Sequence, residues 1–355
     1  MEKVEKMKQK NFRSNLITYA IVILAFAIME AWKASGNLSS LLSGLLVPIC
    51  VYVVLAISLN LVVGISGELS LGHAGFMCVG AFSSAFFSKC TEEVITFMPL
   101  RFFLAILIGA AVAAIFGLLI GIPVLRLRGD YLAIVTLAFG EIIKNVINIF
   151  YIGLDENGFH VSTQDQFSLN MEADGQIILG GPQGITSITK CSTFLVGVIL
   201  ILISLFIVLN LVNSRDGRSI MAIRDNRIAA ESIGINVTKY KLMAFTVSAA
   251  LAGAAGALYS HNLSTLQASK FNFNTSILAL VFVVLGGIGN MRGSIIAAVI
   301  LTVLPEMLRF LSDYRMLIYA IVLIVMMLVN WSPKALEMRE RLMSRFFHKS
   351  AKEGE

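Results

Sequence analysis

Charged residues are scarce in this sequence. Only 14% of its 355 residues are Asp, Glu, Lys or Arg, whereas 57% are hydrophobic. A soluble domain carries about a quarter of its residues as charges, so a soluble protein is excluded and the lipid bilayer is the expected solvent. The net charge of +6 does not indicate nucleic acid, because the basic residues form short clusters between apolar runs rather than one basic face.

Motifs that would support an enzyme are also missing. No lysine follows a glycine, which excludes a phosphate-binding loop of the Walker type, and neither H-E-x-x-H nor G-x-S-x-G occurs. The four cysteines form no C-x-x-C pair and lie in or beside apolar runs, where free cysteine packs as a small apolar residue. We therefore expect no catalytic residue, metal or cofactor in this chain. If ATP drives it, another chain binds the ATP.

Long apolar runs dominate what is present. A helix needs about 20 mainly apolar residues to cross the ~30 Å hydrocarbon core. The sequence predicts an all-α, polytopic bundle with about ten spans, the eighth of them short for a crossing: residues 16–32, 41–64, 69–88, 100–125, 131–152, 193–212, 242–260, 275–289, 294–311 and 315–331. The first run follows a basic stretch as in a signal peptide, but no clear cleavage site follows, so we interpret it as an uncleaved span.

Basic clusters predict the orientation, because cytoplasmic loops collect Lys and Arg. With alternating spans, four clusters fall on one side: the N-terminal tail 1–15, Arg126 with Arg128, the segment 214–241 and the C-terminal tail 332–355. The longest segment on the other side, 153–192, has five acidic residues against one lysine. We expect both termini in the cytoplasm, and an external loop or cap that separates the helices of 16–152 from those of 193–331.

A polar, glycine-rich segment interrupts the apolar pattern at residues 64–76 (GISGELSLGHAGF). Broken backbone survives in a membrane only where it is buried in protein or lines a wet cavity. Glu68, Ser70, His73 and Phe76 are therefore candidates for the wall of a substrate path. The alternative is a tight turn between helices in which Glu68 is solvated and His73 is hydrogen-bonded.

Glu141 and Lys144 lie in the middle of the predicted span 131–152, with Asn145 and Asn148 close behind. Three residues apart, the two charges share one helical face and can neutralise each other. An unpaired charge at mid-bilayer costs at least ~2.5 kcal/mol on insertion scales, so a partner or a wet cavity is required. A structural ion pair and a contact to substrate both remain open.

Glycines also end a short apolar run at residues 282–294 (FVVLGGIGNMRGS). A half-crossing followed by a turn would fit this pattern and would place Gly286 and Gly287 beside a path. A glycine-rich loop between complete helices fits it equally well.

The segment 216–241 is amphipathic and helix-prone, and it follows the sixth span on the predicted cytoplasmic side. We expect two short helices separated near Gly234, a shape suited to docking on a groove of a soluble partner. A helix lying on the membrane surface is the alternative. Ala229, Ala230 and Gly234 favour docking, because they leave a face with too little bulk to anchor in lipid.

From about residue 60 to residue 330, the sequence resembles the LivM-type permeases of branched-chain amino acid ABC importers. The resemblance rests on four motifs: residues 66–76 (SGELSLGHAGF), 127–143 (LRGDYLAIVTLAFGEII), 180–185 (GGPQGI) and 217–234 (GRSIMAIRDNRIAAESIG). It implies an importer of the bacterial plasma membrane with a second, LivH-like permease, two cytoplasmic ATPase subunits and an extracytoplasmic binding protein that delivers Leu, Ile or Val.

The resemblance also implies that the segment after the sixth span grips the ATPase. The residues expected to do so are Arg218, Arg224, Asp225, Asn226, Ala229, Ala230 and Gly234. The A-A-x-x-x-G pattern at 229–234 resembles the EAA loop of importers, although Ile228 stands where a glutamate is expected. The outer segment between Ile152 and Gly180 is longer and more acidic than the family leads us to expect.

Alternating access is the expected mechanism, in which partner ATPases move the coupling segment and the spans rock about a central path. A permease for urea or short amides is the nearest rival, because the shared motifs belong to the machine rather than to its substrate. The other rival is a self-sufficient, ion-coupled secondary transporter or channel, in which Glu141 and His73 would relay protons or ions.

Overall fold

A computed structural model describes residues 2–36, 39–127, 129–155, 158–171 and 175–308, and a few residues between 314 and 328; side chains are described from residue 15 on. Residues 1–299 form one compact unit and residues 300–355 another, and all contacts discussed below lie within the first. Most of the expected tenth span, 315–331, and the whole expected tail, 332–355, fall outside the described residues.

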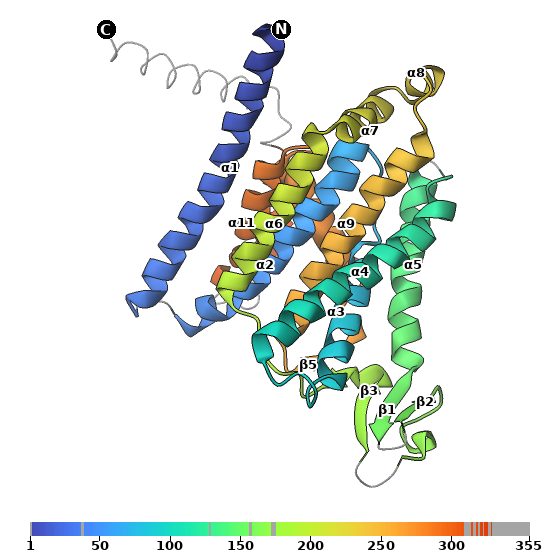
Figure 1. Cartoon of the computed structure of the whole chain (residues 1–355). Helices are drawn as coiled ribbons and strands as arrows, with labels where there is room; N and C mark the ends of the chain where they lie inside the picture. The colour runs from blue at the N-terminus through green and yellow to red at the C-terminus, as the bar shows by residue number, and fades with distance from the viewer. Residues whose placement is uncertain are drawn as a thin grey trace. The chain divides into compact units, whose positions relative to one another are not determined.

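Helices dominate the first unit (Figure 1). They are α1 (Glu2–Ala34), α2 (Ser40–Asn60) continued by the π-helix η1 (Leu61–Ser66), α3 (His73–Cys90), α4 (Met98–Val124), α5 (Asp130–Ile149), α6 (Phe194–Asn213), α7 (Arg215–Asp225), α8 (Arg227–Ser232), α9 (Val237–Ser260), α10 (Phe273–Gly286) and α11 (Met291–Met307), which runs into the second unit. In the described part of the chain, seven helical segments are long and apolar enough to cross a membrane: Asn15–Ala34, Ser40–Ser66, Met98–Val124, Asp130–Ile149, Phe194–Asn213, Val237–Ser260 and Ala268–Gly286.

The all-α, polytopic fold is thus confirmed, but the number of spans differs from ten. The expected third span is the 18-residue helix α3, which begins at His73 rather than at residue 69 because Gly67 adopts φ +74° and ends the preceding helix. It contacts α4, α5 and α9, and its serines Ser84 and Ser88 are buried against protein. The expected ninth span corresponds to α11, which has 17 residues.

Helix α9 is the centre of the packing, because it contacts α2, α3 and α4. Its small residues let neighbouring backbones approach closely. A Cβ on Gly253 would lie 2.7 Å from the carbonyl oxygen of Gly109 in α4, and a Cβ on Gly80 in α3 would collide with the backbone of Gly253. Small residues serve this role in lipid, where burial of apolar surface gives little driving force for helix association.

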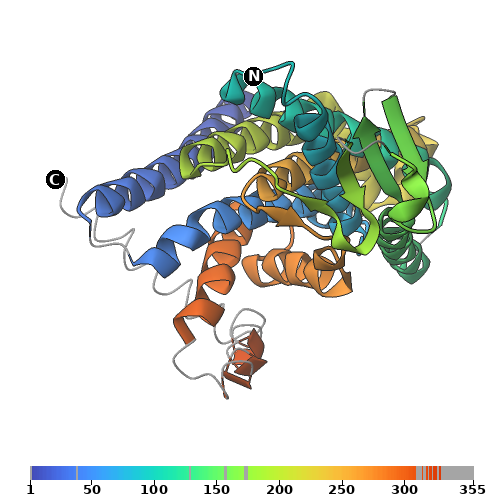
Figure 2. The same ribbon diagram turned by 90° about the horizontal axis from the view of Figure 1, so that it is seen from below.

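A small β structure caps the end of the bundle that lies opposite α7 and α8 (Figures 1 and 2). Its strands are β1 (Tyr151–Asp155), β2 (Gly158–Ser162) and β3 (Gln176–Gly180), which form an antiparallel sheet in the order β2-β1-β3, and β4 (Ile185–Thr186), which pairs with β5 (Thr265–Leu266). Lys89 at the end of α3 donates to the carbonyl oxygens of Ile177 and Thr186 at 2.9 and 3.0 Å. The described parts of the segment 153–192 therefore form strands and turns that are anchored to α3.

Candidate functional site

Helices α7 and α8 form a bent element between α6 and α9, which we call the coupling segment (residues 214–241). Its two helices separate at Asn226 and not near Gly234 as expected. Asn226 has extended backbone (φ −155°, ψ 100°), and its side chain accepts a hydrogen bond from Ala229 N at 3.1 Å, so it caps the start of α8. Gly234 instead follows the end of α8 in the left-handed region, at φ +85°.

The coupling segment has an inner and an outer face. Ile223, Ala230 and Val237 form a small buried cluster beneath it, so Ala230 faces inward and is not on the exposed surface. Outward, the side chains of Ile228 and Ile233 are 78% and 76% exposed. The outer face is therefore more apolar than the predicted face of small residues, and the sequence signal for Ile228 is its place where a glutamate is expected.

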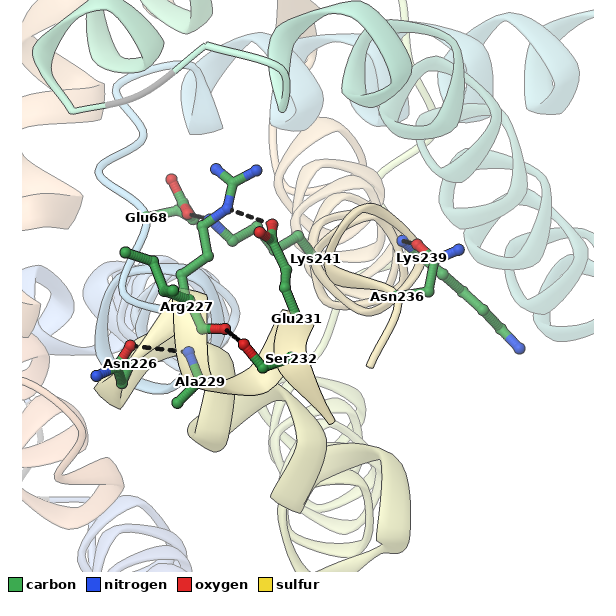
Figure 3. A network of polar contacts seen from close by, with 10 residues as sticks. Glu68, Asn226, Arg227, Ala229, Glu231, Ser232, Asn236, Lys239 and Lys241 are labelled. Carbon is green, nitrogen blue, oxygen red and sulfur yellow. Dashed lines mark hydrogen bonds and ion pairs between the residues drawn. The ribbon is translucent and has the colours of Figure 1, made fainter. Parts of the chain in front are cut away.

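Exposed polar side chains of the coupling segment contact one another (Figure 3) and the end of α6. Arg227 pairs with Glu231 one turn later at 2.9 Å, and Arg218 donates to the carbonyl oxygen of Asn213 at 3.1 Å, where α6 ends. Such exposed contacts contribute little to stability, so the shape of the segment depends mainly on the buried cluster of Ile223, Ala230 and Val237 and on the Asn226 cap.

Two charged contacts join the coupling segment and the start of α9 to the glycine-rich segment 64–76. The guanidinium of Arg224 donates to the carbonyl oxygen of Gly64 at 3.0 Å, and Lys241 forms an ion pair with Glu68 (Figure 3). Glu68 is therefore not solvated, contrary to the tight-turn alternative. Asp225, the neighbour of Arg224, accepts from the same guanidinium at 2.9 Å.

Gly64 in turn packs against the turn between α10 and α11. A Cβ on Gly64 would lie 2.7 Å from the Cα of Gly289. Asn60 binds both this turn and the first turn of α11, because its Oδ1 accepts from Gly289 N and its Nδ2 donates to Ser294 Oγ, both at 2.9 Å. The coupling segment is thus connected to this turn through Arg224 and the C-terminal end of α2 with η1.

The turn itself follows a short helix. α10 has 14 residues, or about 21 Å at 1.5 Å per residue, and Gly287 ends it with φ +93°. A Cβ on Gly286 would collide with the backbone of Gly293 and Ser294, so α11 starts directly against the end of α10.

His73 and its neighbours are buried among helices. His73 Nε2 lies 2.8 Å from Ser248 Oγ, which itself donates to Ser58 O at 2.5 Å. Because the serine proton is used there, Nε2 is the donor and Nδ1 is left as an acceptor. Among the described atoms, His73 Nδ1 and Ser70 Oγ are buried without a hydrogen-bond partner. The hydrogen bond of His73 is compatible with both interpretations of this segment, the wall of a substrate path and the tight turn between helices.

Phe76 links this interior to α5. Its ring packs at 5.2 Å from Phe139 in α5 and at 5.3 Å from Phe245 in α9. Two residues beyond Phe139, Glu141 forms an ion pair with Lys144. Their side chains are 33% and 19% exposed, so the pair lies at the edge of the packed interior rather than inside it.

The candidate residues therefore form three groups: the coupling segment, the interior around His73 and the turn at Gly287, and the polar pair on α5. The first two are connected by the Arg224 contact. The third approaches the second through the aromatic rings of Phe76 and Phe139 and through the close approach of Gly140 to Gly75.

The profile of the family described as "Branched-chain amino acid transport system / permease component" matches residues 41–328. The chain belongs to this permease family.

Relatives of the permease include transporters of different substrates. The high-affinity branched-chain amino acid transport system permease protein LivM of Salmonella typhimurium is 34% identical over 93% of this chain and 75% of its own. LivM of Escherichia coli is 36% identical over 81% of this chain and 67% of its own length. The ribose import permease protein RbsC of Escherichia coli is 26% identical over 91% of this chain and 94% of its own length. No solved structure matches the permease.

Proposed function

We propose that this permease imports branched-chain amino acids as one of two related, LivH- and LivM-like permeases that together enclose the path, driven by cytoplasmic ATPase subunits. The observation that carries the proposal is the contact chain from the exposed coupling segment through Arg224 to the turn between α10 and α11. Such a chain suits a membrane component that is moved by a separate motor. The higher identity to the LivM proteins than to the ribose permease favours amino acids as cargo.

The orientation follows from charge. The coupling segment carries Arg215, Arg218, Arg224 and Arg227, and basic segments stay in the cytoplasm. The β structure then lies outside, where an extracytoplasmic binding protein would deliver the substrate, and both termini lie inside in a bacterial plasma membrane. Ile228 and Ile233 project toward the cytoplasmic ATPase, together with Ala229 and Gly234.

Alternating access requires contacts that differ between two states. We infer that closure of the ATPase subunits pulls α7, that Arg224 carries this displacement to Gly64, and that the turn at Gly287 shifts with it. Ser70 and His73 lie beside these elements with unsatisfied buried atoms. Buried polar groups without a partner call for an explanation, and exposure to a wet path in the other state would supply one.

Reconstituted uptake tests the proposal. Vesicles that contain the two permeases and the ATPase subunits, with binding protein added, should accumulate leucine only when ATP is supplied on the cytoplasmic side. Uptake by this chain alone along an ion gradient would replace the proposal by the secondary transporter. ATP-driven uptake of urea without leucine would replace its substrate by a short amide.

Arg224→Met should uncouple ATP hydrolysis from transport. The substitution keeps an apolar side chain beside Gly67 but removes the hydrogen bond to Gly64 O. A hydrogen bond from a charged group contributes about 1.5–3 kcal/mol, so we expect leucine uptake to fall by roughly tenfold to hundredfold, while the ATPase subunits still co-purify. Lys33→Met is the control, because it also removes one positive charge but lies on α1, where Lys33 pairs with Glu30; equal losses in both variants would contradict the role of Arg224.

A further inference from the structure

Four polar residues form a stripe on the outer half of α5. Glu141, Lys144, Asn145 and Asn148 follow the spacing i, i+3, i+4 and i+7, which places them on one side of the helix. Asn145 is exposed, and Glu141 and Lys144 are each partly exposed. Gly140, which approaches Gly75 of α3, lies one turn before Lys144, so the stripe borders the packed side of α5 at Lys144 and turns away from it at Asn145.

The depth of the stripe makes lipid contact unfavourable. Glu141 lies eight residues before Ile149, where α5 ends, or about 12 Å along the helix. In a hydrocarbon core of ~30 Å this is close to the middle of the bilayer, where ionisable residues face a bundle interior or a water-filled cavity. The stripe therefore faces water or the second permease, and the side chains of the ion pair are accessible from there.

We propose that Glu141 and Lys144 bind the zwitterionic head group that all α-amino acids share. The Glu141 carboxylate accepts from the α-ammonium of the substrate, and the Lys144 ammonium donates to its α-carboxylate. This site rests on the proposed function, since it gives the path a contact for amino acids that a path for sugars or amides does not need.

Charge balance supports such a site at this depth. Without substrate, Glu141 and Lys144 neutralise each other; with substrate, one ion pair is exchanged for two, and the net charge stays zero. A molecule with a single charge would leave one protein charge unpaired, at a cost of at least ~2.5 kcal/mol on insertion scales. The site thus selects for zwitterions, and it releases them easily because the two side chains can pair again.

Thiol protection tests this site without relying on ATP hydrolysis. Asn145→Cys, in the importer assembled with its partner chains, should react with a water-soluble cationic methanethiosulfonate reagent. The wild-type chain measures the background from its own four thiols: Cys50 and Cys78 are buried, and Cys90 and Cys191 are half-buried. Burial raises the pKa of the Cys191 thiol, which lowers its reactivity.

Leucine at millimolar concentration should slow modification of Asn145→Cys at least fivefold. The same concentrations of 4-methylpentanoate, which has only the carboxylate, and of 3-methylbutylamine, which has only the ammonium, should slow it less than twofold. Protection by leucine should be lost when Glu141→Gln and Lys144→Met are added. Equal protection by all three compounds, no protection by leucine, or protection that survives neutralisation of the pair would each overturn the proposal.

A second ion pair with the same spacing provides the control. Glu30 and Lys33 on α1 pair at 3.7 Å and are both exposed, so Glu30→Gln with Lys33→Met should leave protection of Asn145→Cys unchanged. ATP-driven leucine uptake by the wild-type importer is measured in the same preparation. Uptake without protection refutes the zwitterion site alone, whereas absence of uptake refutes the proposed function.

Discussion

Ile228→Asp combined with Ile233→Asp is expected to abolish ATP-driven uptake. Both side chains are more than three-quarters exposed on the outer face of the coupling segment, so aspartate at either position leaves the fold of the permease intact. Burial of an isoleucine at an interface contributes about 1.5–3 kcal/mol. Loss of both therefore lowers the affinity for the ATPase subunits by about a hundredfold or more. Co-purification of the ATPase with the tagged permease measures this directly.

Two controls separate docking from a general effect of charge. Ile228→Val with Ile233→Val keeps apolar contact and should retain most of the ATPase binding. Phe167→Asp changes an even more exposed apolar residue, between β2 and β3 at the opposite end of the bundle, and should leave the ATPase bound. If the double aspartate variant retains the ATPase at wild-type affinity, the coupling segment does not dock through this face.

The fold class could be predicted from the sequence because apolar runs of the required length have few alternatives in a protein so poor in charge. The limits of α3 could not, because they depend on Gly67 and on contacts with distant residues. Leu71 N donates to Thr136 Oγ1 of α5, and Ala74 N donates to Ser276 Oγ of α10. Such contacts leave no periodic pattern in the segment itself.

In the candidate site too, features set by local sequence could be predicted, and features set by distant contacts could not. The position of the coupling segment and the pairing of Glu141 with Lys144 follow from local spacing, and the structure contains both. The partners of Glu68 and Arg224 are 173 and 160 residues away, and nothing local indicates them. The break between α7 and α8 at Asn226 could have been predicted, because asparagine is a strong N-cap residue. Gly234 is the more obvious helix breaker in this sequence and points to the wrong position.

Gly253→Leu is expected to prevent folding of the permease altogether. Even a Cβ at this position would lie 2.7 Å from the carbonyl oxygen of Gly109 in α4, and the rest of a leucine side chain cannot turn away within the centre of the bundle. Overpacking costs about 1–3 kcal/mol where side chains can shift. Here the obstacle is the backbone of a packed helix, so the cost exceeds that range and approaches the whole stability of a typical domain.

The measurement is the yield of monodisperse protein in detergent, which should fall at least tenfold. Gly44→Leu is the matched control, because Gly44 lies in a spanning helix, α2, but a Cβ there meets nothing within 4 Å; its yield should equal that of the wild type. The comparison isolates backbone approach from the change in apolarity, which is identical in the two variants. A normal yield of Gly253→Leu would mean that α3, α4 and α9 do not approach as closely as the glycines permit, and that the bundle is held together by other contacts.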